Sequence, residues 1–203
     1  MGLTVFSSSE SKPLRKRYYS DRGVVKAVYL PGKVFTTVER LDEPRPNDLL
    51  NLYSRSVEDN LCLMFGKPST NTFERNKETV CSEVTKLFIL DIEWIPVSMS
   101  PSLDAVPERH LDFILRNLGF NKPESLAAFI APSASCGIKN FSKLQTYRWH
   151  VWLFLDKEYH QDEVRKVLEK TLPSPYVDSA PLRQAQMIAI QEGIYPADVH
   201  RHD

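Results

Sequence analysis

Residues 87–94, Leu-Phe-Ile-Leu-Asp-Ile-Glu-Trp, form an apolar run that carries two carboxylates. A run this apolar is typical of a buried strand. Side chains alternate across a strand, so Asp91 and Glu93 are expected on one face, where two acids beside an apolar core repel each other. A divalent metal ion would offset that repulsion. The run therefore predicts a buried strand that carries a candidate metal site.

The first half of the chain predicts several short elements. With 203 residues, 42% of them apolar, the chain can form one large domain or two small ones. The Ser-rich residues 1–11 are expected to be mobile. Residues 24–30 and 34–38 flank Pro31-Gly32 and predict a hairpin. A short helix is predicted behind Asn47 as its N-cap, with an apolar stripe of Leu49, Leu52, Tyr53 and Val57 at helical spacing. A strand over 61–65 and a loop or boundary over 66–79 are predicted to follow.

The second half shows a clearer alternation of strands and helices. After the acidic strand, an apolar stripe at helical spacing ends at Gly119 and predicts a helix. Strands are predicted over 127–131 and 149–155, and a helix over 162–172. A short strand at 176–178 then leads into a stretch whose Leu182, Ala185 and Ala189 are in helical phase. This order predicts a sheet covered by helices, an α+β fold.

The overall charge is balanced, with 26 basic and 26 acidic residues, so charge alone does not indicate nucleic acid. Basic residues nevertheless gather near the amino end, around Tyr18 and Tyr19. They are Lys12, Arg15, Lys16, Arg17, Arg22 and Lys26. A basic, aromatic segment can hold a phosphate backbone and stack on bases, and a solvated terminal arm is the alternative.

The cysteines indicate a reducing compartment. Cys62, Cys81 and Cys136 are odd in number and far apart, with no Cys-x-x-Cys pair, which argues against a disulfide framework or a zinc knuckle. No signal peptide is recognisable, and no apolar run approaches the length of a membrane span. A cytoplasmic or nucleoid-associated protein without a membrane partner is therefore expected.

Further polar residues follow the later strands. Ser133 and Ser135 come just past a strand, where small residues let amides and hydroxyls meet phosphate oxygens. Arg148 and His150 flank Trp149, and alternation puts both on one face, as two donors that can hold a triphosphate. Asp178 lies on the short returning strand and could complete a metal-binding set. For each residue a structural role, such as an ion pair, a strand-end contact or a turn, is the alternative.

Three carboxylates near two basic groups suit nucleotidyl transfer. That reaction uses two divalent ions, one to activate the attacking 3′-hydroxyl and one to neutralise the triphosphate and its leaving pyrophosphate. Carboxylate oxygens suit Mg²⁺ or Mn²⁺. Basic residues across the site would stabilise the charge that develops on the phosphates.

These residues resemble the archaeo-eukaryotic primase superfamily, the primase-polymerases, and especially the mobile-element versions and the eukaryotic PrimPol enzymes. Leu-Asp-Ile-Glu at 90–93 resembles the family's hydrophobic-Asp-x-Asp/Glu motif, which binds metal. Arg148-Trp149-His150 falls where the family has Ser-x-His, whose histidine contacts the nucleotide phosphates. Val177-Asp178 resembles the third motif, which supplies the remaining metal ligand. The resemblance covers roughly residues 86–190.

The resemblance implies a fold and a set of roles. Residues 1–80 would form an amino-terminal α/β module with a basic arm, and residues 81–203 an RRM-like catalytic module. Asp91, Glu93 and Asp178 would hold two ions of Mg²⁺ or Mn²⁺. His150, Arg148, Ser135 and Ser133 would bind the nucleotide. The family's serine is Arg148 here, so its phosphate contact would pass to the guanidinium and to Ser133 or Ser135.

The implied activity is template-dependent synthesis or extension of primers on single-stranded DNA from nucleoside triphosphates, in replication of a mobile element. Many relatives continue into a helicase or zinc-binding domain, so a replicative helicase is a candidate partner, and the chain is a candidate catalytic core of a longer protein. Two alternatives stay open. One is an inactive RRM-like nucleic-acid-binding or replication-initiator module, and the other is a metal-dependent nuclease.

Overall fold

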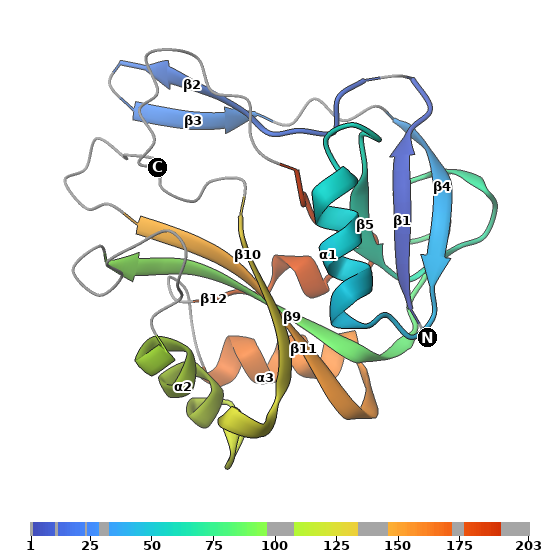
Figure 1. Cartoon of the computed structure of the whole chain (residues 1–203). Helices are drawn as coiled ribbons and strands as arrows, with labels where there is room; N and C mark the ends of the chain where they lie inside the picture. Colours follow the sequence, from blue (N-terminus) through green and yellow to red (C-terminus); the bar gives the residue numbers. More distant parts are fainter. Residues whose placement is uncertain are drawn as a thin grey trace.

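Two four-stranded antiparallel sheets and three α-helices dominate the described structure, which confirms the expected α+β class (Figure 1). The structure is a computed structural model, and it describes residues 2–10, 12–22, 24–28, 33–96, 108–133, 146–171 and 177–191. Within these ranges, the side chains of residues 24, 93–96, 108–110 and 146–147 are outside the description.

The first sheet has the strand order β5-β1-β4-β7. Its strands are β1 (Leu3–Ser8), β4 (Val34–Leu41), β5 (Cys62–Phe65) and β7 (Thr72–Glu74). Strand β1 lies between two partners, and its residues 3–6 are fully buried. The Thr4 hydroxyl donates to the Gly66 carbonyl at 2.6 Å. The expected mobility is therefore wrong for this strand, because its apolar residues pack into the core.

Helix α1 (Pro46–Arg55) lies beside the first sheet and contacts the second (Figure 1). It begins before the expected cap, Asn47, because proline suits the first helical turn, and the Arg45 N–H is bonded to Asp48 Oδ2 at 2.7 Å. Its buried residues are Leu49 and Leu52. The predicted helix is thus confirmed with an earlier start.

The second sheet has the order β10-β11-β9-β12, with every neighbouring pair antiparallel. Its strands are β9 (Val84–Pro96), β10 (Ala127–Pro132), β11 (Thr146–His160) and β12 (Val177–Asp178). Helix α2 (Glu108–Asn117) connects β9 to β10, and α3 (Gln161–Thr171) connects β11 to β12. Figure 1 shows α2 and α3 on one side of this sheet and α1 with the first sheet on the other. The predicted strands and both helices are confirmed.

The predicted hairpin is wrong. Strand β3 (Val24–Val28) pairs with β2 (Arg17–Asp21), whereas β4 pairs with β1 and β7. The ring of Phe35 on β4 packs edge-on against Phe6 at 5.3 Å between centroids, so distant aromatic packing decides the partner of β4. Residues 31–32, where the turn was expected, are outside the described residues.

The predicted loop over residues 66–79 holds short strands instead. These are β6 (Lys67–Pro68), which pairs with β8 (Val80–Cys81), and β7. A further short element, the 3₁₀ turn η2 (Pro123–Ser125), precedes β10.

The helical stretch expected after Asp178 is also wrong. Within the described residues 177–191, the one helical element is a 3₁₀ turn, η3 (Ala180–Leu182). Ala185 has a φ of 59°, and Ile188 exchanges two backbone hydrogen bonds with Leu63 of β5, at 2.7 and 3.1 Å. The segment is therefore held as an extended chain against the first sheet, an arrangement that helical phase could not reveal.

One cluster of buried residues joins the two sheets. Phe65 of β5 and Trp152 of β11 lie with ring centroids 6.0 Å apart, and Leu3, Val5 and Ile89 belong to the same cluster. The two sheets therefore pack face to face, and the bridge from Ile188 returns the chain to the first sheet. No helix among the described residues is long and apolar enough to cross a membrane.

Candidate functional site

Three of the predicted site residues lie side by side across the second sheet. Asp91 on β9 pairs directly with His150 on β11 and with Asp178 on β12. Directly paired residues of antiparallel strands point to the same face, with Cβ atoms about 5 Å apart. The three side chains therefore share one face, although 28 residues separate Asp178 from His150 and 59 separate His150 from Asp91 in the chain.

Two further predicted residues extend this row toward one end of the sheet. Arg148 lies two positions before His150 on β11, and the N–H of Ser133 donates to the Arg148 carbonyl at 2.9 Å. Alternation puts Arg148 on the face of His150. Ser133 is buried, and Arg148 is partly exposed. Ser135 lies outside the described residues.

The register beside Glu93 is irregular. Trp149 pairs with Ile92, whereas Tyr147 pairs with Ile95, so two residues of β9 stand opposite one residue of β11. Such a β-bulge interrupts the strict alternation that predicts a shared face for Asp91 and Glu93. The side chain of Glu93 lies outside the described residues, so its direction stays a prediction.

His150 is held by a side chain from helix α1. The Tyr53 hydroxyl on α1 lies 3.0 Å from His150 Nδ1, and Trp152 Nε1 donates to the same hydroxyl at 3.0 Å. The Tyr53 ring packs edge-on against Phe129 of β10, with centroids 5.2 Å apart. On the other side of the imidazole, Nε2 lies 3.7 Å from Asp91 Oδ1. Helix α1 therefore contributes directly to this cluster.

Burial determines the protonation states of His150 and Tyr53. Burial, with a smaller contribution from the nearby Lys16 ammonium, lowers the pKa of His150 from 6.5 to about 3. Burial, assisted by the negative charge of Asp91, raises the pKa of the Tyr53 hydroxyl. At neutral pH the imidazole is therefore uncharged and the phenol keeps its proton.

Part of the basic amino-terminal segment is anchored near this site. Leu14 is buried, and its N–H donates to Asn60 Oδ1 at 2.7 Å, while Asn60 Nδ2 donates to the Lys12 carbonyl at 2.8 Å. Lys16 follows two residues later and acts electrostatically on His150. Of the two neighbouring tyrosines, Tyr18 is buried and Tyr19 is exposed, so only Tyr19 is available for stacking.

The two described carboxylates suit a hard divalent cation. Asp91 and Asp178 face each other on adjacent strands, where like charges destabilise the pair unless a cation lies between them. Asp178 Oδ1 accepts from the Ala180 N–H at 2.8 Å, which orients the carboxylate. Among the side chains that the structure describes, there is no group of three or more His, Cys, Asp or Glu residues arranged so that it could hold a metal ion. The third predicted ligand, Glu93, is not among those side chains.

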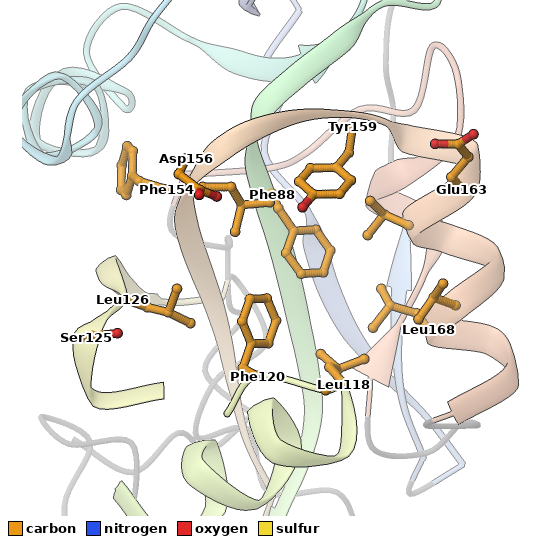
Figure 2. Close-up of a pocket in the computed structure, with 14 residues that line it drawn as sticks. Phe88, Leu118, Phe120, Ser125, Leu126, Phe154, Asp156, Tyr159, Glu163 and Leu168 are labelled. Carbon is orange, nitrogen blue, oxygen red and sulfur yellow. The ribbon is translucent and has the colours of Figure 1, made fainter. Parts of the chain in front are cut away.

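A cavity of about 640 Å³ lies on the opposite face of the sheet, between α2, β11 and α3 (Figure 2). Figure 2 shows the rings of Phe88 and Phe120 pointing into it, with Tyr159 beside them. None of the predicted site residues whose side chains are described lines it. We place the candidate site at the polar row instead, because reactive polar groups converge there, whereas the cavity is lined mainly by apolar side chains.

The sequence did not single out Tyr53 or Lys16. Tyr53 belongs to the predicted apolar stripe of α1, and no local pattern pairs it with a histidine 97 residues later. Lys16 is one of several basic residues near the amino end, with no local feature that separates it from the others. Both were hidden because the two modules meet only in the tertiary structure.

Comparison of the chain with protein-family models, with curated proteins and with solved structures gave no match. Evidence on the function of this chain therefore comes from its own sequence and geometry.

Proposed function

We propose that this chain is a DNA primase-polymerase, a nucleotidyltransferase that makes or extends primers on single-stranded DNA. The observation that supports this most is the row of Asp91, His150 and Asp178, paired in register on one face of the second sheet. The three primase-like motifs are far apart in the sequence, and a chance likeness would not require their polar residues to meet.

The topology of the second sheet adds support. Its elements follow in the order strand, helix, strand, strand, helix, strand, and the sheet order is β10-β11-β9-β12. This is the β-α-β-β-α-β arrangement of ferredoxin-like domains, to which the four-stranded RRM sheet belongs. An RRM-like catalytic module packed against an amino-terminal α/β module is the architecture that the primase resemblance implies.

In this proposal the carboxylates hold the metals and the basic groups hold the nucleotide. Asp91, Asp178 and Glu93 would bind Mg²⁺ or Mn²⁺, which when bound activate the 3′-hydroxyl and neutralise the triphosphate. The neutral His150 would offer one N–H to a phosphate oxygen, and Arg148 a charged donor beside it. Both groups lie on the face of the carboxylates, so each can stabilise the same phosphates.

The anchored basic segment is the proposed contact for the template. Lys16 acts on the site electrostatically, and the exposed ring of Tyr19 can stack on a base. Replication of a mobile element with a helicase partner, in the cytoplasm or nucleoid, belongs to the same proposal. Phosphate contacts of this kind weaken as salt increases.

Incorporation of labelled nucleotides on primed and unprimed single-stranded DNA, with Mg²⁺ or Mn²⁺, tests the proposal. Asp178→Asn removes the charge but keeps an oxygen that can accept from the Ala180 N–H, so it is expected to lose incorporation without unfolding. Glu163→Gln on the exposed surface of α3 is the matched charge control and is expected to remain active.

The other outcomes separate the alternatives. Metal-dependent loss of the labelled strand without added nucleotides would indicate a nuclease. Binding of single-stranded DNA by a folded chain with neither incorporation nor cleavage would overturn the enzyme proposal in favour of a binding module.

A further inference from the structure

We propose that Tyr53 is a positioning residue that holds His150 as the neutral Nε2–H tautomer, with its N–H directed toward Asp91. The role of this N–H as a phosphate donor rests on the proposed function, whereas the tautomer itself does not. The proposal stands on three consecutive polar contacts, Trp152 to Tyr53, Tyr53 to His150, and His150 to Asp91.

The direction of each hydrogen bond follows from the groups involved. The indole Nε1 of Trp152 can only donate, so the Tyr53 oxygen accepts from it at 3.0 Å. The hydroxyl of Tyr53 carries one proton, and the acceptor that the structure places within reach, at 3.0 Å, is His150 Nδ1. An Nδ1 that accepts carries no hydrogen. In a neutral ring the proton must then be on Nε2.

The tautomer decides what the outer edge of the ring can do. Nε2 lies 3.7 Å from Asp91 Oδ1, beyond a direct hydrogen bond but close enough for both to contact one phosphate group or water molecule. With the hydrogen on Nε2, this edge donates to an oxygen. With the hydrogen on Nδ1, a lone pair would face the carboxylate and any phosphate oxygen, and the contact would be repulsive.

The position of Tyr53 is itself rigid. The residue belongs to α1, which is fixed by the buried Leu49 and Leu52, and its ring packs against Phe129. His150 is only 5% exposed, so solvent has little access with which to favour one tautomer. The amino-terminal module would thus act on the site through one hydroxyl.

The tautomer can be measured without any assay of activity. Four histidines are replaced by glutamine so that His150 is the only one of the five that remains. They are His110, His160, His200 and His202. In this ¹⁵N-histidine-labelled protein, long-range ¹H–¹⁵N correlation spectra distinguish a protonated Nε2 from a protonated Nδ1.

We expect a protonated Nε2 and a bare Nδ1 before any further change. Tyr53→Phe keeps the ring and removes the hydroxyl, and should give a mixture of tautomers or a protonated Nδ1. Tyr159→Phe, which removes a hydroxyl at the cavity on the opposite face, is the matched control and should leave the spectrum unchanged. A protonated Nδ1 in the background protein, or an unchanged spectrum in folded Tyr53→Phe, would overturn the proposal.

A kinetic measurement tells a failure of this inference from a failure of the proposed function. If the chain incorporates nucleotides, Tyr53→Phe should lower kcat/KM for the nucleotide by about tenfold, as expected for one misdirected hydrogen bond to a charged group. If the chain incorporates nucleotides but Tyr53→Phe changes neither the tautomer of His150 nor kcat/KM, the positioning role alone would be refuted. If Tyr53→Phe changes the tautomer of His150 but the chain does not incorporate nucleotides, the proposed function alone would be refuted.

Discussion

The two faces of the second sheet carry different chemistry, although they are built from the same strands. On the face toward α1, Asp91 lies beside His150 and Asp178. On the face toward α2 and α3, their strand neighbours Leu90 and Val151 are fully buried in the apolar core. At Asp91 and His150, a step of one residue along the strand therefore passes from the polar site to the packing surface on the other face. Substitutions at adjacent positions should then affect different properties.

The largest expected effect is on activity at the polar face. Asp91→Asn removes one of two facing carboxylates, and we expect nucleotide incorporation to fall on the order of a thousandfold, because metal binding and charge stabilisation are lost together. The free energy of unfolding without metal should change by no more than about 1 kcal/mol, since relief of the like-charge pair with Asp178 opposes the loss of the other contacts of Asp91. Single-turnover incorporation and urea unfolding measure the two quantities. Loss of activity only in proportion to unfolded protein would contradict the assignment.

At Leu90, one residue before Asp91, a substitution should affect stability rather than activity. Leu90→Ala leaves a void in the apolar face and should lower the free energy of unfolding by about 2–5 kcal/mol. The specific activity of the fraction that remains folded should change little. Chemical denaturation, with activity corrected for the folded fraction, makes the comparison. A folded Leu90→Ala with activity as low as Asp91→Asn would show that the two faces are not separable.

The buried imidazole predicts a pH dependence of stability. The folded pKa of His150 is lowered to about 3 from 6.5, so between these values the unfolded chain binds a proton that the folded chain does not. The contribution of the neutral His150 to the free energy of unfolding is therefore fully present above pH 6.5. It is lost as the pH falls toward 3, and the free energy of unfolding then decreases with a slope that approaches about 1.4 kcal/mol per pH unit. Urea unfolding without divalent ions should show a flatter profile for His150→Gln. Parallel profiles for the two proteins would argue against a buried neutral ring.

The smallest effect is expected at the cavity. Val164 of α3 lines it, and Val164→Ile adds one methylene to unoccupied space, so we expect a gain of roughly 0.5 kcal/mol in the free energy of unfolding. Nucleotide incorporation should be unchanged, because the cavity lies on the face away from Asp91. Thermal unfolding monitored by circular dichroism can resolve the shift. A change in kcat without a change in stability would show that this face communicates with the site.

The local pattern of apolar residues was a good guide to the second sheet and its two helices. The strands around residues 87–94, 127–131 and 149–155 were predicted because each is a nearly continuous apolar run, and the two helices that flank them because their apolar residues repeat at helical spacing. The local pattern failed in the segments at residues 1–11, 24–38 and 182–189. Partners far away in the chain decide the conformation of β1, of β4 and of the segment at residues 182–189, whereas β3 pairs with β2, which directly precedes it.

The candidate site divides in the same way. Asp91, His150 and Asp178 could be selected from the sequence, because a charged or polar residue in an otherwise apolar strand is conspicuous. Alternation predicted a shared face only for Asp91 with Glu93 and for Arg148 with His150. The register that places Asp91, His150 and Asp178 side by side could not be predicted from the sequence, since it depends on backbone pairing between segments up to 87 residues apart. The bulge opposite Arg148 is likewise a property of pairing and leaves no signal in composition.

By itself, the sequence determined the α+β class, most of the second sheet and which polar residues stand on its strands, because these depend on the alternation of neighbouring side chains. Only the tertiary structure decided that β1 is a buried strand and that α1 of the first module delivers Tyr53 to His150. The physical reason is that the partner and protonation of a buried polar group depend on what packs against it, and here that partner lies 97 residues away.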